Sequence, residues 1–288
     1  MKEQKWILEN ENTFELKHIF DCGQCFRWKE NLDGSYTGIF GNNVINVKKE
    51  ANKIIFKGIT EDDISKICTK YFDLNRDYQK IKKDLSNIDE YMKESIEFGH
   101  GIRILNQDLW ETIISFIISA NNNIPRIKGI IERISYKYGK KITYNNEEYY
   151  TFPTPEELSK ASIEDLRKLG LGFRDKRVYE TTKMIAEGKV DLEELRNEKD
   201  FEKVRDILLS LPGVGPKVAD CILLFSDLKR FEAFPIDVWV RRVMNELYIK
   251  YEDEGKVNKR IMEKIAQEKF GDLAGLAQQY LFFWKREA

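Results

Sequence analysis

The spacing of hydrophobic and polar residues changes near residue 60. Before that point, short alternating or β-branched runs at 37–40, 44–47 and 53–56 are separated by turn-forming Asn, Asp and Gly residues, a pattern typical of antiparallel strands. From Thr60, which we take as a helix cap because acidic residues follow it, apolar residues recur at helical spacing. The pattern predicts an α+β protein, with a small N-terminal antiparallel β-sheet domain followed by an α-helical body.

The second half of the chain has clear helix signals. An apolar run at 109–120 stops at three asparagines, which favours a buried helix that ends there. We place the domain boundary so that 1–100 form the β domain with flanking helices and 101–288 form the helical body, whose last helices pack back toward the N-terminal part. Further helices are expected at 125–138, after the capping box at 154–157, from Ser162, on both sides of 211–215, from Asp237 and over 271–285.

Composition excludes few functions. The 288 residues are 42% hydrophobic and 34% charged, which is ordinary for a soluble globular protein. There is no apolar stretch of the roughly 20 residues that a membrane span needs, and no secretory segment follows Met1, so we expect an intracellular protein, in the cytoplasm or nucleoid if it is bacterial. The net charge of −1 does not by itself indicate a nucleic-acid partner, although a local basic surface remains possible.

Four cysteines invite a metal or redox interpretation. Cys22 and Cys25 form a C-x-x-C pair, but no second pair follows, and His18 and His100 are not at ligand spacing. We expect buried free thiols in a reducing compartment, with a metal or redox role as the alternative.

Residues 211–220 contain the most informative motif. Two glycines flank a valine, and Pro216 follows at a position that suits the first residue of a helix. A hairpin between two helices with this sequence presents backbone N–H groups to an anion such as a phosphodiester. The alternative is a tight corner whose glycines serve packing alone.

Lys217 falls in the first turn of that helix, where the macrodipole disfavours a cation. This is a suitable place for a lysine that loses its proton and acts as a nucleophile. Lys217, Cys221 and Phe225 share one helix face. This face is suited to form the wall of a pocket for a flat ligand; the alternative is that Cys221 and Phe225 are core residues and Lys217 extends to the surface. Asp237 suits a helix N-cap, and an amine paired with a fixed carboxylate suits attack on a sugar carbon as a base departs.

The motif at 211–220 together with Asp237 resembles the helix-hairpin-helix and Gly/Pro…Asp motif of base-excision DNA glycosylases. Four more segments, at 23–28, 119–124, 166–174 and 277–282, resemble those of 8-oxoguanine DNA glycosylases with lyase activity, in the family order. The resemblance covers about residues 5 to 285. It implies a DNA-repair enzyme that flips out and removes 8-oxoguanine, preferably opposite cytosine, and then cleaves the abasic strand by β-elimination. It also implies double-stranded DNA as partner, no membrane, a monomer and no cofactor.

The resemblance also implies roles for residues of the base pocket. Lys217 would attack C1′ and form a Schiff base, with Asp237 as the catalytic carboxylate. Gly23 would accept a hydrogen bond from N7–H, which oxidised guanine has and guanine lacks. The flipped base would be bound by Cys221 and Phe282 on its two faces, by Gln278 at its Watson–Crick edge, and by Phe225 and Pro235.

Another set of residues would bind the DNA around the lesion. Asn121 would fill the gap in the duplex and pair with the orphaned cytosine, with help from Arg126 and Arg174. Phe173 would wedge between base pairs where the family usually has tyrosine, and Trp239 stands where a phosphate-binding histidine is common. The backbone around Gly213, Gly215 and Val218 would bind phosphate.

Iron–sulfur relatives carry four cysteines after the catalytic aspartate, whereas this chain has none after Cys221, so we expect no iron–sulfur cluster. Family hairpins can hold a cation through backbone carbonyls, here near Leu209, Leu211 and Val214. Two other functions remain open. A monofunctional alkylpurine glycosylase of the same fold would need Asp237 but not Lys217, and a non-catalytic damaged-DNA-binding module would need neither.

Overall fold

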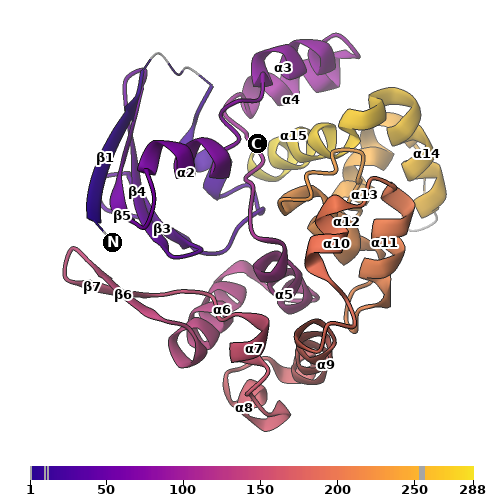
Figure 1. Ribbon diagram of the computed structural model, residues 1–288. Helices are drawn as coiled ribbons and strands as arrows, with labels where there is room; N and C mark the ends of the chain where they lie inside the picture. The colour runs from indigo at the N-terminus through magenta and orange to yellow at the C-terminus, as the bar shows by residue number, and fades with distance from the viewer. Residues whose placement is uncertain (1, 10, 12, 253–256) are drawn as a thin grey trace.

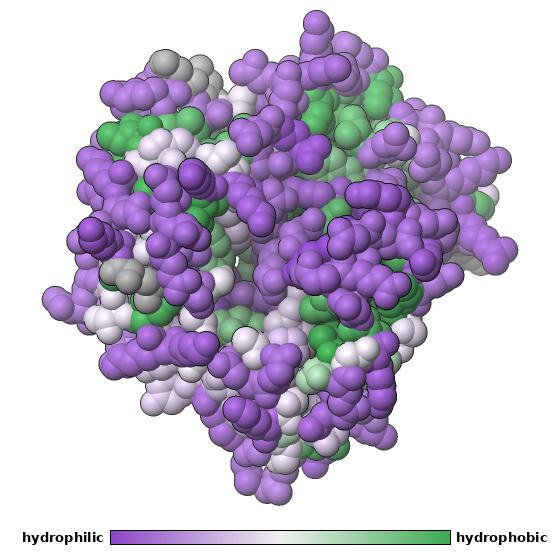
Figure 2. All heavy atoms as spheres, viewed as in Figure 1, coloured by the Kyte–Doolittle hydropathy of each residue, from purple (hydrophilic) through white to green (hydrophobic). Residues whose placement is uncertain are grey.

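The computed structural model describes residues 2–9, 11, 13–252 and 257–288. A sheet lies at one side of the molecule and a larger helical body at the other (Figure 1). Hydrophilic residues cover most of the face seen in Figure 2, and hydrophobic areas are small. No helix in the described part of the chain is long and apolar enough to cross a membrane.

The sheet is five-stranded and antiparallel, in the order β1-β5-β4-β3-β2. Buried and exposed residues alternate along β5, which places Ile54 and Phe56 in the core. The three predicted strands are confirmed as β3, β4 and β5. The strands are β1 (Lys2–Leu8), β2 (Trp28–Glu30), β3 (Tyr36–Phe40), β4 (Asn43–Glu50) and β5 (Lys53–Thr60).

The expected helix cap at Thr60 is wrong. Thr60 is the last residue of β5 and pairs with Lys2 of β1. The next helix, α2 (Ile64–Tyr71), is instead capped by Asp63, whose carboxylate accepts hydrogen bonds from the N–H groups of Ser65 and Lys66. Pairing with β1 therefore extends β5 through Thr60, the residue for which the following acidic residues predicted a helix cap.

The helical body confirms the predicted helices at 109–120 and 125–138, now α5 and α6. The last helix begins at Ala274 rather than at Gly271, because Gly271 has φ +52° and ends the preceding helix. The helices are α1 (Leu16–Phe20), α3 (Tyr78–Ser86), α4 (Glu90–Phe98), α5 (Leu109–Ser119), α6 (Ile124–Tyr138), α7 (Pro155–Leu158), α8 (Ile163–Lys168), η1 (Gly172–Arg174), α9 (Asp175–Ala186), α10 (Leu192–Asn197), α11 (Phe201–Ser210), α12 (Pro216–Phe225), α13 (Val238–Met244), η2 (Asn245–Ile249), α14 (Lys259–Phe270), η4 (Gly271–Leu273) and α15 (Ala274–Glu287).

Two hydrophobic cores hold these elements together. The first lies under the sheet, where rings such as Phe14, Phe56 and Phe72 contact one another. The second fills the helical body and also includes residues of α3 and α4, such as Leu85 and Met92. Helix α15 packs on α4, so the C-terminal end of the chain returns to the N-terminal part (Figure 1).

A short hairpin that the sequence pattern did not predict joins the two parts. It consists of β6 (Lys141–Tyr144) and β7 (Glu147–Tyr150). Ile142 and Tyr144 pack against Ile39 and Val44 of the sheet. The hairpin therefore extends from the helical body to cover residues at the edge of the β domain.

Candidate active site

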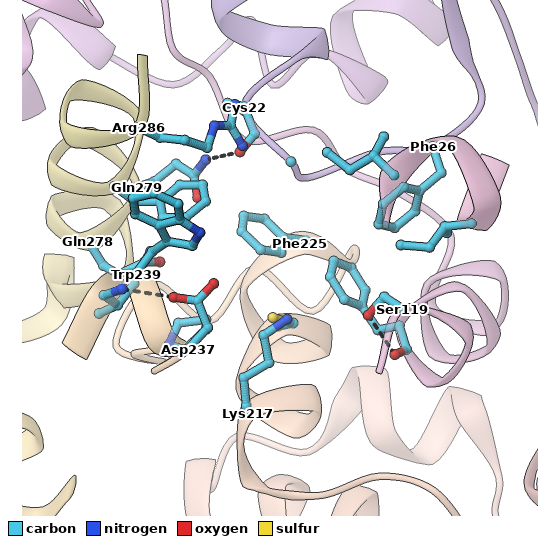
Figure 3. A pocket seen from close by; sticks show the side chains of 18 of the residues that line it. Cys22, Phe26, Ser119, Lys217, Phe225, Asp237, Trp239, Gln278, Gln279 and Arg286 are labelled. Carbon is cyan, nitrogen blue, oxygen red and sulfur yellow. Dashed lines mark hydrogen bonds between the residues drawn. The ribbon is translucent and has the colours of Figure 1, made fainter. Parts of the chain in front are cut away.

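A cavity of about 390 Å³ lies where α5, α6, α12, α13, α15 and the loop before β2 meet (Figure 3). This size is sufficient for a small organic ligand. Nine residues singled out from the sequence line it: Gly23, Lys217, Cys221, Phe225, Pro235, Asp237, Trp239, Gln278 and Phe282. Side chains that are up to 259 positions apart in the chain are thus brought to one cavity.

Helices α11 and α12 and the turn between them place Lys217. Gly213 has φ +89°, a left-handed conformation that favours glycine, and the Thr181 hydroxyl donates to the Pro212 carbonyl at 2.9 Å. Gly215 caps α12 without a side-chain hydrogen bond, and Pro216 is the first helical residue. The N–H groups of the first turn of α12 are therefore available to an anion.

Lys217 is half-buried, and its Nζ lies 5.5 Å from the centre of the Phe116 ring. Cys221, through its charge when it ionises and as a hydrogen-bond partner, raises the pKa of Lys217; burial opposes this shift, and the negative charge of Asp237 adds to it. Burial in turn raises the pKa of the Cys221 thiol. In the free protein these neighbours shift the pKa of Lys217 upward, opposite to the direction in which the helix N-terminus acts.

Asp237 is the N-cap of α13, as its sequence position predicted. Its carboxylate accepts a hydrogen bond from the Val240 N–H at 2.8 Å, which holds one oxygen in place. Figure 3 shows the Asp237 carboxylate and the Lys217 amine pointing into the same space from two different helices. A fixed carboxylate beside an amine can stabilise a positive charge that develops between them.

Aromatic rings form one wall of the cavity. Phe225 stacks on Phe116 with ring centres 5.7 Å apart and planes at 15°, and Phe26 meets Phe116 edge-on at 5.6 Å. All three rings are buried. This wall suits a flat, partly apolar ligand.

The polar end of the cavity has an unsatisfied acceptor. Gln278 on α15 is 5% exposed, and its buried Oε1 has no hydrogen-bond partner. A buried polar atom without a partner is costly unless a ligand satisfies it. One turn further along α15, the Phe282 ring comes within 3.9 Å of the position that a Cβ on Gly23 would take, and Gly23 has φ +89°. A flat ligand in the cavity would contact Gln278 with its edge and the Phe282 ring with its face.

The loop between α5 and α6 lies beside the cavity. Asn121 is exposed with φ +50°. Arg174 is only 1% exposed, and its guanidinium donates to the carbonyls of Ala120 and Asn121, with the two shortest contacts at 2.6 Å. Arg174 therefore holds the backbone that carries Asn121, whereas Arg126 is exposed and donates to the Gly170 carbonyl at 3.3 Å.

Two exposed rings lie close to arginines. Phe173 is 56% exposed, and the guanidinium carbons of Arg174 and Arg177 lie 4.2 and 5.4 Å from its ring centre. Trp239 is 46% exposed, with Arg242 at 5.6 Å. Exposed aromatic side chains with adjacent cations are typical of surfaces that contact nucleic acid.

The cysteine pair has no features of a metal or redox site. Cys22 and Cys25 are free and buried, and burial raises the pKa of Cys22 to about 11 and that of Cys25 well above its ordinary value. No group of three or more His, Cys, Asp or Glu residues in the described chain could hold a metal ion. At the hairpin, the Val214 N–H donates to the Leu211 carbonyl at 3.0 Å, and Leu209 lies in the last turn of α11.

Sequence reasoning missed several residues of the cavity. Phe116 lies in the largely apolar run of α5, where apolar residues on several sides of the helix leave the side that faces a cavity undefined. Arg286 follows Gln278 and Phe282 at the same i, i+4, i+8 spacing that identified Lys217, Cys221 and Phe225, so a signal was present. The other lining residues not anticipated are Cys22, Phe26, Ser119, Asn122, Asn123, Ile124, Ile127, Val240 and Gln279.

Comparison with known proteins places these features in a family. Residues 6–113 match the 8-oxoguanine DNA glycosylase N-terminal domain, and residues 114–267 match the HhH-GPD superfamily of base excision DNA repair proteins. A probable N-glycosylase/DNA lyase of Methanothermobacter thermautotrophicus is 36% identical over 73% of this chain and 71% of its own length. The N-glycosylase/DNA lyase of Saccharomyces cerevisiae is 32% identical, covering 95% of this chain and 84% of its own.

A solved structure is similar over almost the whole molecule. The 8-oxoguanine glycosylase/lyase of Clostridium acetobutylicum, in complex with double-stranded DNA containing cytosine opposite 8-oxoguanine, is 44% identical to this chain. It superposes with a TM-score of 0.92 and covers 99% of this chain and 97% of its own.

Proposed function

This chain belongs to the HhH-GPD superfamily of base excision DNA repair proteins and has the N-terminal domain of 8-oxoguanine DNA glycosylases, and we propose that it removes 8-oxoguanine from double-stranded DNA and then cleaves the abasic strand. The observation that carries the proposal is the approach of the Lys217 amine and the Asp237 carboxylate to one cavity. The solved Clostridium relative bound to DNA with 8-oxoguanine opposite cytosine supports the same substrate here.

In the first step, the neutral amine of Lys217 attacks C1′ of the flipped nucleotide. The bond from C1′ to the base breaks, and its electron pair leaves with the base, which takes up a proton. Asp237 stabilises the positive charge that grows on the sugar. Because the base must leave the helix for C1′ to be reached, the reaction needs a pocket of this kind beside the duplex.

In the second step, the lysine nitrogen loses one proton, the C1′–O4′ bond breaks as O4′ takes up a proton, and a protonated Schiff base forms at C1′. Asp237 is placed to help transfer these protons. Removal of a proton from C2′ then expels the 3′ phosphate and cleaves the strand by β-elimination. Lys217 and Asp237 supply the nucleophile and the carboxylate for both steps, so we expect the reaction to need no cofactor and no iron–sulfur cluster.

The base would lie between Cys221 and Phe282, with Gln278 at its Watson–Crick edge and Phe225 and Pro235 closing the pocket. The unpartnered Oε1 of Gln278 supports this placement, because a guanine edge offers donors to it. The Gly23 carbonyl would accept the N7–H of the oxidised base. Loss of this single hydrogen bond would discriminate against guanine.

The DNA backbone would meet the hairpin around Gly213, Gly215 and Val218 through main-chain N–H groups. Binding through dipoles does not require a basic protein, which is compatible with the net charge of −1. Asn121 and Arg126 would contact the orphaned cytosine, with Arg174 holding the loop. Phe173 would insert beside that base, Trp239 would face the strand, and a cation could bind the carbonyls near Leu209, Leu211 and Val214. We expect the protein to act as a monomer inside the cell.

Borohydride trapping tests the covalent mechanism. Wild type mixed with a duplex that carries 8-oxoguanine opposite cytosine should yield a stable protein–DNA adduct, and Lys217→Gln should yield none. Lys203→Gln, which removes an exposed lysine from neighbouring α11, is the matched control and should trap normally. Base release without an adduct in wild type would instead support a monofunctional glycosylase, and no base release would support a binding module. Repeating the assay with each opposite base tests the preference for cytosine.

A further inference from the structure

One face of α15 carries three cavity residues in succession: Gln278, Phe282 and Arg286. The facing wall is the loop of Asp21, Cys22 and Gly23, which connects α1 to β2. The two walls come from opposite ends of the chain, and Figure 3 shows Arg286 beside Cys22 where they meet. Arg286 is thus the last side chain on the face of α15 that lines the cavity.

The guanidinium of Arg286 contacts both walls. Its Nη2 donates to the Asp21 carbonyl at 2.5 Å. Its central carbon lies 4.9 Å from the centre of the Phe282 ring, a cation–π distance. Its Nη1 lies 3.5 Å from the position that a Cβ on Gly23 would take. One rigid, planar group therefore links the loop of Gly23 to the ring of Phe282.

The loop is anchored at two further points, neither of which touches Phe282 in this way. Gln279 Nε2 donates to the Cys22 carbonyl at 2.7 Å, and the Tyr36 hydroxyl donates to the Asp21 carboxylate at 2.7 Å. These bonds tie the peptide group before Gly23 to α15 and the Asp21 side chain to the sheet. Arg286 adds a contact of another kind, because its guanidinium also lies against the Phe282 ring.

We propose that Arg286 is a specificity-determining positioning residue, which holds the Gly23 backbone and the Phe282 ring in register around the purine. The inference rests on the proposed function. The position of the Phe282 ring determines where the N7 edge of a base stacked on it lies relative to the Gly23 carbonyl. A hydrogen bond between N7–H and that carbonyl weakens steeply when its distance or angle changes. Arg286 limits the movement of the Gly23 backbone relative to the Phe282 ring. This limit is important because a single hydrogen bond, from N7–H to the Gly23 carbonyl, would discriminate 8-oxoguanine from guanine.

Arg286→Met tests this role, because methionine keeps an apolar contact with Phe282 and loses all hydrogen bonds. We expect single-turnover excision of 8-oxoguanine opposite cytosine to fall about 10- to 100-fold, as a misplacement of about 1 Å can cause. Strand cleavage at a preformed abasic site in the same duplex should stay within about twofold of wild type, because no base remains to be positioned.

Two further variants isolate the effect. Lys285→Met removes a positive charge from the adjacent position of α15, where Lys285 pairs with Glu246, and should excise as wild type does. Arg286→Lys keeps the positive charge and the contact with Phe282 but has a single donor nitrogen, so it should lose less excision activity than Arg286→Met. If Arg286→Met does not fold, Arg286→Lys takes its place in the comparison.

Unchanged excision by Arg286→Met would overturn the inference. So would an equal loss of excision and abasic-site cleavage, since that would indicate general DNA binding or folding. Wild type that fails on both substrates would contradict the proposed function itself, a result distinguishable from either of these.

Discussion

At the scale of single residues, the environment of Lys217 reverses what its position alone suggests. A lysine in the first turn of a helix faces the positive end of the dipole, which predicts an easily lost proton. The side chain at i+4 is Cys221, and Asp237 approaches from α13. Both raise the pKa of Lys217, so Lys217 is an ammonium group in the free protein, and the proposed attack requires that it first lose a proton.

This arrangement predicts a pH effect of Cys221→Ala. Only the unprotonated amine attacks, so the rate rises with pH toward the pKa of Lys217. Removing the sulfur removes the largest cause that raises this pKa, while burial, which lowers it, remains. The rising limb of the pH–rate profile for borohydride trapping at a preformed abasic site should therefore move to lower pH. An abasic site is used because Cys221 would also stack on a base.

Cys68→Ala, which removes a buried thiol from the core under the sheet, serves as the control for that experiment. Its profile should coincide with that of wild type. A Cys221→Ala profile that stays in place or moves to higher pH would show that the sulfur does not govern the ionisation of Lys217.

At the scale of elements, the two hairpin glycines do different things. A Cβ on Gly213 would lie 3.0 Å from Arg177 and 3.1 Å from Ile117, and its φ of +89° is unfavourable for other residues. A Cβ on Gly215 would meet nothing within 4 Å, and Gly215 has φ −94°. Gly213 is thus needed by the fold, whereas the open space at Gly215 is consistent with approach of a ligand.

The two alanine variants separate these roles. Gly213→Ala should lower the free energy of unfolding by about 1–3 kcal/mol, because it forces a left-handed conformation and close contacts. Gly215→Ala should lower it less and should weaken binding to a duplex with an abasic-site analogue by about tenfold, because the methyl group occupies the approach to the backbone. Thermal unfolding and fluorescence anisotropy measure both. Wild-type binding by Gly215→Ala would exclude a main-chain phosphate contact there.

Prediction of the elements succeeded where one physical signal was strong. Strands β3 to β5 are short alternating or β-branched runs between turn residues, and α5 is a long, largely apolar run with an asparagine stop. Prediction failed at Thr60, where pairing with β1 outweighed a local cap signal, and at β6 and β7. Each strand of that hairpin has only four residues. The hairpin is stabilised by contacts with Ile39 and Val44, which are about 100 positions away in the chain.

At the scale of the whole molecule, a partly buried carboxyl group lies beside the buried Arg27, between the β domain and the helical body. Glu111 in the first turn of α5 has its Oε1 3.9 Å from the Nε of Arg27, which precedes β2. Burial raises the pKa of Glu111 from 4.5 to about 7, with Arg27 opposing the shift. Because the folded state holds this proton more tightly than the unfolded chain, stability falls as pH rises from about 4.5 through about 7.

Glu111→Gln should remove this dependence. The free energy of unfolding of wild type should fall more steeply between pH 5 and pH 8 than that of the variant, with a difference on the order of 2 kcal/mol. Denaturant titrations at several pH values measure it. Glu132→Gln, which removes the exposed second partner of Arg27, controls for loss of an ion pair. Parallel slopes for wild type and Glu111→Gln would contradict the assignment.

Local structure and the types of chemical group could be predicted from the order of the amino acids. The glycine turn, the proline start of α12 and the cap at Asp237 depend on neighbouring residues, so they could be predicted from short motifs. The resemblance of these motifs to a family then suggested Gly23, Gln278 and Phe282 as base-binding residues. Interactions between neighbouring residues could not show that these three lie near Lys217.

How these groups affect one another depends on the packing of distant segments. The direction of the Lys217 pKa shift depends on a sulfur and a carboxylate brought in by packing, and the use of Arg174 to hold a loop depends on carbonyls of α5's C-terminal end. The link through Arg286 joins residues 21 and 286. Hydrogen bonds and charges act over a few ångströms, and no pattern along the chain specifies which distant residues come within that range.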